Sequence, residues 1–133
     1  MKDTKTEANR WWRQSKSDFA LLGEILQIGK YDTCCFLAQQ TAEKALKAYL
    51  YAMGEELIFS HSIFKLCEMA AIYDRSFLAL RDTVKQLDFY YVEARYPNAI
   101  EDSIPAEFFG ETDAMTAIEL AKTVLEKVEL SMR

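Results

Sequence analysis

Apolar side chains recur every three or four residues in five segments of this chain, a periodicity typical of helices that bury one face. Only two prolines and four glycines interrupt the 133 residues, and no stretch alternates cleanly enough to indicate a strand. Because helices joined by short loops pack antiparallel, the sequence predicts an all-α fold: an up-down four-helix bundle with an additional short helix, forming one domain over residues 1–133. The predicted helices run over about 7–28, from Asp32 to about Met53, over a short stretch after Ser60, over about 76–95 and over about 112–131.

Residues with strong preferences for helix ends set these boundaries. Gly29 is expected as a C-cap, and Asp32 and Thr112 as N-caps. Pro97 is expected to end the fourth helix, because proline disfavours helical geometry at the preceding residue and donates no N–H. The loop that follows carries apolar residues expected to pack across the domain surface: Ile100, Ile104, Phe108 and Phe109.

Charge and hydropathy exclude several broad classes of protein. The net charge is −5, with the acidic excess in the C-terminal third, and no cluster of Lys and Arg suits duplex nucleic acid. The absence of an apolar run at the N-terminus or of 18 apolar residues anywhere predicts a cytoplasmic protein without a membrane span. Three cysteines, two of them adjacent, fit a reduced compartment better than a disulfide framework.

The usual catalytic motifs are absent. Phosphate-loop, dinucleotide-binding and nucleophile-elbow patterns do not occur, and His61 is the only histidine, which removes metal sites and triads that need two. Zinc held by His61 and the cysteines is disfavoured, because Cys34 and Cys35 would point about 100° apart on a helix. The sequence therefore predicts neither a metal nor a cofactor.

Two polar features remain as candidates for binding. Gln40, Glu43 and Lys47 form a line on the second helix, which as a solvated face would contribute about 0.3–0.5 kcal/mol through the Glu43–Lys47 pair. Arg95 stands at the end of the fourth helix, where a cation suits the helix dipole. It either caps that helix and pairs with Asp88 or Glu43, or it binds a phosphate or RNA backbone.

Residues near Arg95 have two interpretations as well. His61, beside Ser60 at a predicted helix start, is either a capping or hydrogen-bonding residue or a general base. Tyrosines at 90, 91 and 96 either stack a nucleobase or belong to the core with their hydroxyls bonded. Trp11, Trp12, Phe108 and Phe109 exceed what a small bundle is expected to bury, which favours a homodimer.

Four motifs, in order, resemble the HEPN domain family. They are WWRQSKSDFALL, carrying Trp11, Ser15, Asp18 and Phe19; FLAQQTAEKALKAYL; HSIFKL; and LDFYYVEARYPN with its Arg-Tyr-Pro ending. The resemblance implies a four-helix up-down bundle with an extra short helix, usually a homodimer. In several branches of the family the dimer pairs with a minimal nucleotidyltransferase as a toxin–antitoxin system.

Catalytic members of the family are metal-independent RNases that use an arginine followed four to six residues later by a histidine. Arg95 matches that arginine, but positions 99–101 are Ala, Ile and Glu, and no histidine follows. Cleavage by 2′-OH attack needs a proton-transfer group as well as a cation, and Arg95 supplies only the cation.

The first hypothesis is therefore a non-catalytic HEPN dimer that binds a nucleotide or nucleic-acid phosphate and partners a nucleotidyltransferase. The alternative is an atypical RNase in which Arg95 works with His61 or a carboxylate; a purely structural scaffold is a third interpretation. Neither the ligand nor any RNA target follows from the sequence. The candidate ligand-binding residues are Arg95, Tyr96, Tyr91, Asp88, Gln40, Glu43 and Lys47.

Overall fold

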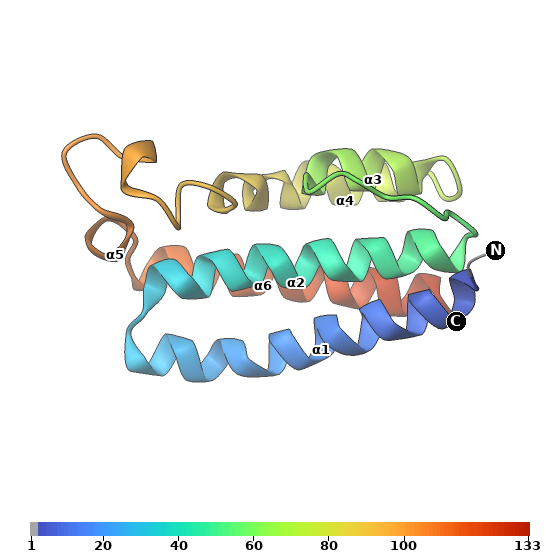
Figure 1. The fold of residues 1–133 in the computed structure, drawn as a ribbon, viewed down its shortest axis with the longest axis horizontal. Helices are drawn as coiled ribbons and strands as arrows, with labels where there is room; N and C mark the ends of the chain where they lie inside the picture. Colours follow the sequence, from blue (N-terminus) through green and yellow to red (C-terminus); the bar gives the residue numbers. More distant parts are fainter. Residues whose placement is uncertain (1–2) are drawn as a thin grey trace.

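The computed structural model describes residues 3–133, which form helices and connecting segments without a β-strand (Figure 1). Three long helices, α1, α2 and α6, lie side by side, and the shorter α3 and α4 pack on the opposite side of α2 and α6 from α1. The all-α bundle is thus confirmed. The α-helices are α1 (Thr4–Ile28), α2 (Tyr31–Ala52), α3 (Ile63–Ala71), α4 (Phe77–Val84), α5 (Pro105–Phe108) and α6 (Glu111–Ser131), and two 3₁₀ helices are η1 (Lys85–Tyr90) and η2 (Pro97–Ala99).

Helix α2 is the centre of the molecule, because its neighbours cover it on almost every side. Small side chains at Ala38, Ala42 and Ala45 are fully buried and let the adjacent helix axes come close. Larger residues such as Phe77 fill the space toward α4, where the ring lies 4.6 Å from that of Tyr49. No helix in the described residues is both long and apolar enough to cross a membrane.

Two of the predicted helix caps were wrong and one is confirmed. Gly29 ends α1 with φ +81°, a left-handed conformation that favours glycine. Lys30, rather than Asp32, occupies the N-cap position of α2, and its ammonium lies 2.8 Å from the Asp32 carboxylate in the first turn. Helix α6 begins one residue earlier than predicted, after Gly110, whose N–H donates to the Asp113 carboxylate at 2.9 Å. Thr112 is therefore inside the helix.

The predicted fourth helix, about 76–95, was wrong in its second half. The α-helix ends at Val84, and the chain tightens into η1 before turning toward Pro97. A 3₁₀ helix has three residues per turn, so Val84, Leu87 and Tyr90 all face the core, each at most 3% exposed. Tyr91, for which a place in the core was one of the two expectations, is only partly buried.

The segment predicted as a loop at 98–111 contains η2 and the short helix α5. Its apolar side chains divide between the core and solvent. Phe109 is 3% exposed and Ile100 packs against the core, whereas Phe108 is 54% exposed and Ile104 43% exposed. The prediction that this segment packs across the surface holds for Phe109 and Ile100 and fails for the other two.

Candidate functional site

A carboxylate buried in α2 organises the polar centre of the molecule. Glu43 is 5% exposed and accepts hydrogen bonds from the Lys47 ammonium at 2.9 Å and from the amides of Gln39 and Gln40 at 3.3 and 3.4 Å. Lys47 is 4% exposed, so both charges of the pair are withdrawn from water. The interpretation of Glu43 and Lys47 as a solvated face is therefore wrong.

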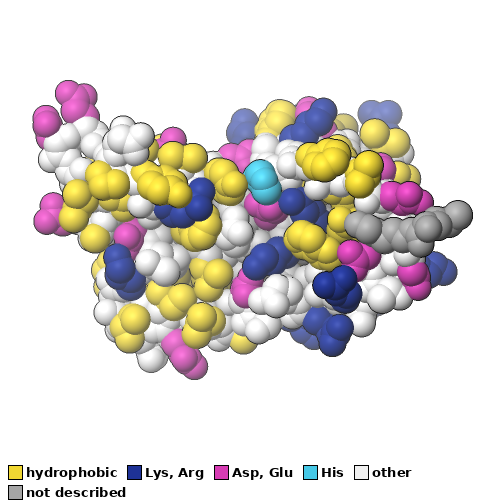
Figure 2. Space-filling view, viewed as in Figure 1, with side chains coloured by type: hydrophobic (Ala, Val, Ile, Leu, Met, Phe, Trp, Pro, Cys, Tyr) yellow, Lys and Arg dark blue, Asp and Glu magenta, His cyan; other side chains and the backbone are white. Residues whose placement is uncertain are grey.

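His61 joins this buried carboxylate to the surface. Its Nδ1 lies 2.9 Å from Oε2 of Glu43, while its side chain is 55% exposed. The backbone at His61 is held against α2, because the Gln39 amide donates to the His61 carbonyl at 3.1 Å. No described residue hydrogen-bonds Nε2. In Figure 2 the single histidine, in cyan, lies near the middle of the face formed by α1, α2 and the elements above them.

Tyr91 connects His61 with Arg95. The imidazole stacks on the Tyr91 ring with centroids 5.4 Å apart and an interplanar angle of 13°. The Arg95 guanidinium carbon lies 4.8 Å from the centroid of the same ring and 4.3 Å from that of Phe36 on α2. The tighter turn of η1 makes this possible, since it points Tyr90 into the core and leaves Tyr91 beside α2.

Arg95 is exposed, and its partners are rings and a carbonyl. Its Nε donates to the Tyr91 carbonyl at 2.7 Å, and Tyr96 supplies a third ring at 5.0 Å. Among residues 3–133 no carboxylate lies within ion-pair distance of the guanidinium. The predicted pairing with Asp88 or Glu43 is therefore wrong, whereas capping of the turn at Tyr91 is observed.

Asp88 serves as the cap of α3 from outside that helix. Its carboxylate accepts from the backbone N–H groups of Ile63 and Phe64 and from the Ser62 hydroxyl, at 2.5, 3.1 and 2.8 Å. A carboxylate satisfies the unpaired N–H groups of a helix start and suits its dipole. Burial first, and the Asp88 charge second, raise the pKa of the nearby Cys67 thiol to about 12. Asp88 thus has a structural role beside the site.

Two hollows flank these residues. One of about 310 Å³ is lined by His61, Ser62, Asp88 and Tyr91, and one of about 320 Å³ is lined by Asp32, Thr33, Phe36, Ala94, Arg95 and Tyr96. Each is small, open and bounded by a different group, the imidazole in the first and the guanidinium in the second. The described residues contain no cluster of three or more His, Cys, Asp or Glu suited to a metal ion.

The structure thus brings most predicted residues into one chain of contacts. Gln40, Glu43, His61, Tyr91 and Arg95 follow one another, with Lys47 and Tyr96 at the two ends. Sequence reasoning missed Gln39 and Phe36. The signal for Phe36 was its spacing, because residues 36, 40, 43 and 47 share one face of a helix.

Comparison with known proteins gives the family. The HEPN domain model matches residues 8–131. A crystal structure of TT1696 from Thermus thermophilus is 31% identical, with a TM-score of 0.80, over 93% of this chain and 97% of that one. A crystal structure of ST0689, described as an archaeal HEPN homologue, is 29% identical, with a TM-score of 0.78, over the whole of both chains. No curated protein matches. This chain therefore belongs to the HEPN domain family.

Proposed function

We propose that this chain is a single HEPN domain over residues 1–133 that binds the phosphate of a nucleotide or of a nucleic acid at Arg95, without cleaving it. The observation that carries the proposal is the state of Arg95: an exposed guanidinium held among three aromatic rings, with no carboxylate partner among the described residues. A guanidinium offers a planar fork of donors that matches phosphate oxygens. The rings restrict its rotamers, so less side-chain entropy is lost on binding.

The aromatic surroundings favour a phosphate that carries a base. Tyr96 is 48% exposed, next to the hollow that Arg95 lines. Exposed rings beside a cation suit nucleotides, because every base has a face that stacks. An inorganic anion would use the guanidinium alone.

Isothermal titration calorimetry with ATP and with a short RNA tests the proposal. Arg95→Ala should weaken binding about tenfold or more, because hydrogen bonds to a charged group contribute about 1.5–3 kcal/mol each. Arg75→Ala is the matched control: it removes the same charge from an exposed position in the turn before α4 and should leave affinity unchanged. Equal effects of the two substitutions, or no binding by the unaltered protein, would refute the proposal.

A second candidate, RNA cleavage, is favoured by one observation. His61 stacks on the ring that Arg95 also contacts, its Nδ1 lies 2.9 Å from Glu43, and its Nε2 has no hydrogen-bond partner among the described residues. A carboxylate that orients an imidazole in this way leaves the other nitrogen for proton transfer. We expect no turnover of single-stranded RNA in EDTA; cleavage that His61→Gln abolishes would replace our proposal with this one.

The proposal includes a homodimer and a protein partner. Phe89 and Phe108 are 47% and 54% exposed and gather around the buried Phe109, at 6.1 and 5.2 Å between centroids, which supports a contact surface there. Phe108→Ser should shift a dimer toward monomer in light scattering coupled to gel filtration. The nucleotidyltransferase partner is tested by co-purification with a minimal nucleotidyltransferase encoded beside this chain, and failure to co-purify would remove that part alone.

A further inference from the structure

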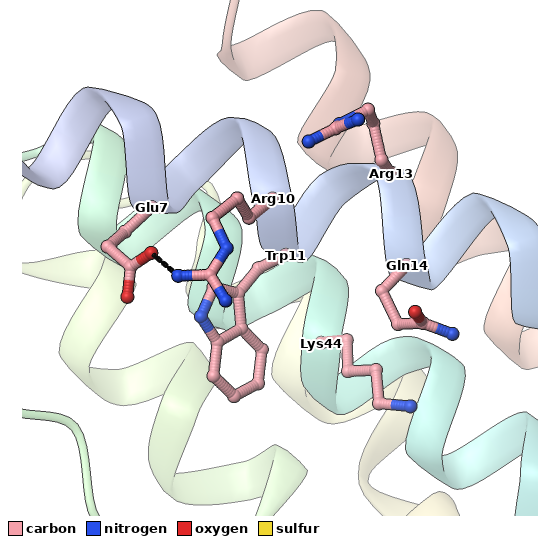
Figure 3. A pocket seen from close by; sticks show the side chains of 6 residues that line it. All are labelled: Glu7, Arg10, Trp11, Arg13, Gln14 and Lys44. Atoms are coloured by element: carbon pink, nitrogen blue, oxygen red, sulfur yellow. Dashed lines mark hydrogen bonds and ion pairs between the residues drawn. The ribbon is translucent and has the colours of Figure 1, made fainter.

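A third hollow, larger than the two beside His61 and Arg95, lies between α1 and α2, away from Arg95. It has a volume of about 550 Å³ and is lined by Glu7, Arg10, Trp11, Arg13, Gln14 and Lys44 (Figure 3). Five of these residues come from α1 and Lys44 comes from α2. Glu7, Arg10, Trp11 and Gln14 are three or four residues apart and share one side of α1, whereas Arg13 extends from the other side of the helix in Figure 3. We call this hollow the Trp11 groove.

Basic groups outnumber acidic ones in the Trp11 groove. Arg10 is bonded to Glu7 at 2.6 Å, and Lys44 to Asp18 at 2.5 Å just outside the lining. Arg13 is exposed, and no carboxylate of residues 3–133 lies within ion-pair distance of it. The chain as a whole has a net charge of −5, so an anion should bind more favourably in this net positive hollow than elsewhere on the surface.

An aromatic ring stands among these cations. In Figure 3 the Trp11 indole extends from α1 beside the Arg10 guanidinium, with the Lys44 side chain on the other side of the ring. Tyr51 and Lys47 hold the indole from α2, with a ring centroid at 5.8 Å and an ammonium at 5.4 Å. The indole is therefore held in place and partly exposed, which suits stacking of a planar group.

The Trp11 groove is connected to the Arg95 site by direct contacts. Lys47 lies over the Trp11 ring and bonds Glu43, and Glu43 bonds His61, which stacks on Tyr91. Along α2 the connection runs from Phe36, under Arg95, to Lys47. At 1.5 Å per residue these positions are about 16 Å apart, the length of about five stacked nucleotides at 3.4 Å each.

Cations interleaved with rings along one face are typical of surfaces that bind single-stranded nucleic acid. Figure 2 shows basic side chains spread over this face on both sides of the histidine, separated by apolar ones. Resting on the proposed phosphate site at Arg95, we infer that the Trp11 groove is a second subsite of the same surface, so that the ligand is a single-stranded RNA several nucleotides long. One end of the strand lies at Arg95, and the other places a base on Trp11 and phosphates on Arg10, Arg13 and Lys44.

The experiment compares labelled oligouridylates of three and ten nucleotides by fluorescence anisotropy, with ATP titrated separately. The unaltered protein should bind the decamer at least tenfold more tightly than the trimer. Arg10→Ala and Arg13→Ala should each lower decamer affinity several-fold and reduce the slope of log affinity against log salt by about 0.7, the value for one phosphate contact to a single strand. Arg75→Ala controls for net charge.

A direct signal comes from Trp11. In a Trp12→Phe background Trp11 is the only tryptophan, and its fluorescence should fall when the decamer binds and stay unchanged with ATP. This variant remains informative if Arg10→Ala folds poorly.

The two proposals fail differently. One result would overturn the second subsite and leave the first. It is ATP binding that depends on Arg95, together with a decamer affinity no higher than that of the trimer or no effect of Arg10→Ala and Arg13→Ala. If the unaltered protein binds neither ATP nor either oligonucleotide, both proposals are overturned. A decaglutamate that displaces the decamer and quenches Trp11 at equal concentration would overturn the RNA assignment in favour of an acidic protein segment.

Discussion

The buried Glu43–Lys47 pair gives the sharpest test of the structure. In Glu43→Gln, the Lys47 ammonium, 4% exposed, would lose the only carboxylate bonded to it in the described residues. Breaking one side of a buried ion pair costs about 3–5 kcal/mol, against a total stability of about 5–15 kcal/mol. With an unfolding entropy of about 2.1 cal/mol/K per residue, 133 residues give about 280 cal/mol/K. The expected decrease in Tm is therefore about 11–18 °C.

Thermal unfolding followed by far-UV circular dichroism measures this decrease in Tm. Three further variants test whether the decrease comes from the buried ion pair. Glu129→Gln removes a carboxylate from another i, i+4 pair, with Arg133, whose side chains are 53% and 70% exposed. It should cost less than about 0.5 kcal/mol. Lys47→Met should cost less than Glu43→Gln, because Glu43 keeps its amide and imidazole donors. The double variant should be more stable than Glu43→Gln alone. A Glu43→Gln protein no less stable than Glu129→Gln would refute the reasoning.

Three further predictions concern stability. Burial raises the pKa of Cys34 to about 11 and that of Cys35 to about 12, from 9.0. The two thiols therefore contribute fully to stability below pH 9, and this contribution is lost as the pH rises toward 11–12. Urea unfolding should give a lower free energy of unfolding at pH 10 than at pH 8. The difference between the two pH values should be smaller for Cys34→Ala. Asp88→Ala should cost about 1–2 kcal/mol in the same assay by removing the cap of α3, and an equal cost for the exposed Asp82→Ala would contradict this. Gly29→Ala should cost about 1–2 kcal/mol, because φ is +81° there, whereas Gly23→Ala, inside α1 with open space around it, should not destabilise.

Local preferences predicted the fold wherever a helix depends on its own residues. The apolar spacing of α1, α2 and α6 and the glycine at 29 were sufficient, because periodicity and backbone freedom are properties of the segment itself. The switch from α4 to η1 was not predictable in this way. Asp88 bonds the N-terminus of α3, 24 to 26 residues earlier, and a 3₁₀ turn keeps Leu87 and Tyr90 in the core.

In the candidate site, too, residue types were predictable from the sequence and their arrangement in space was not. Arg95, Tyr91 and His61 could each be named from residue type and position, but their mutual arrangement depends on two irregular segments. One is the connection 53–62 that carries His61 over α2, and the other is the set of turns after η1 that brings Arg95 back onto Phe36. Neither segment has a periodicity that a sequence pattern can detect. A histidine missing after Arg95 in the sequence therefore says nothing about an imidazole near it in space, and His61 on the Tyr91 ring is that imidazole. Its Nε2 has no hydrogen-bond partner among the described residues, so the RNA assay in EDTA with His61→Gln separates proton transfer by this nitrogen from a role in which His61 only packs on the Tyr91 ring.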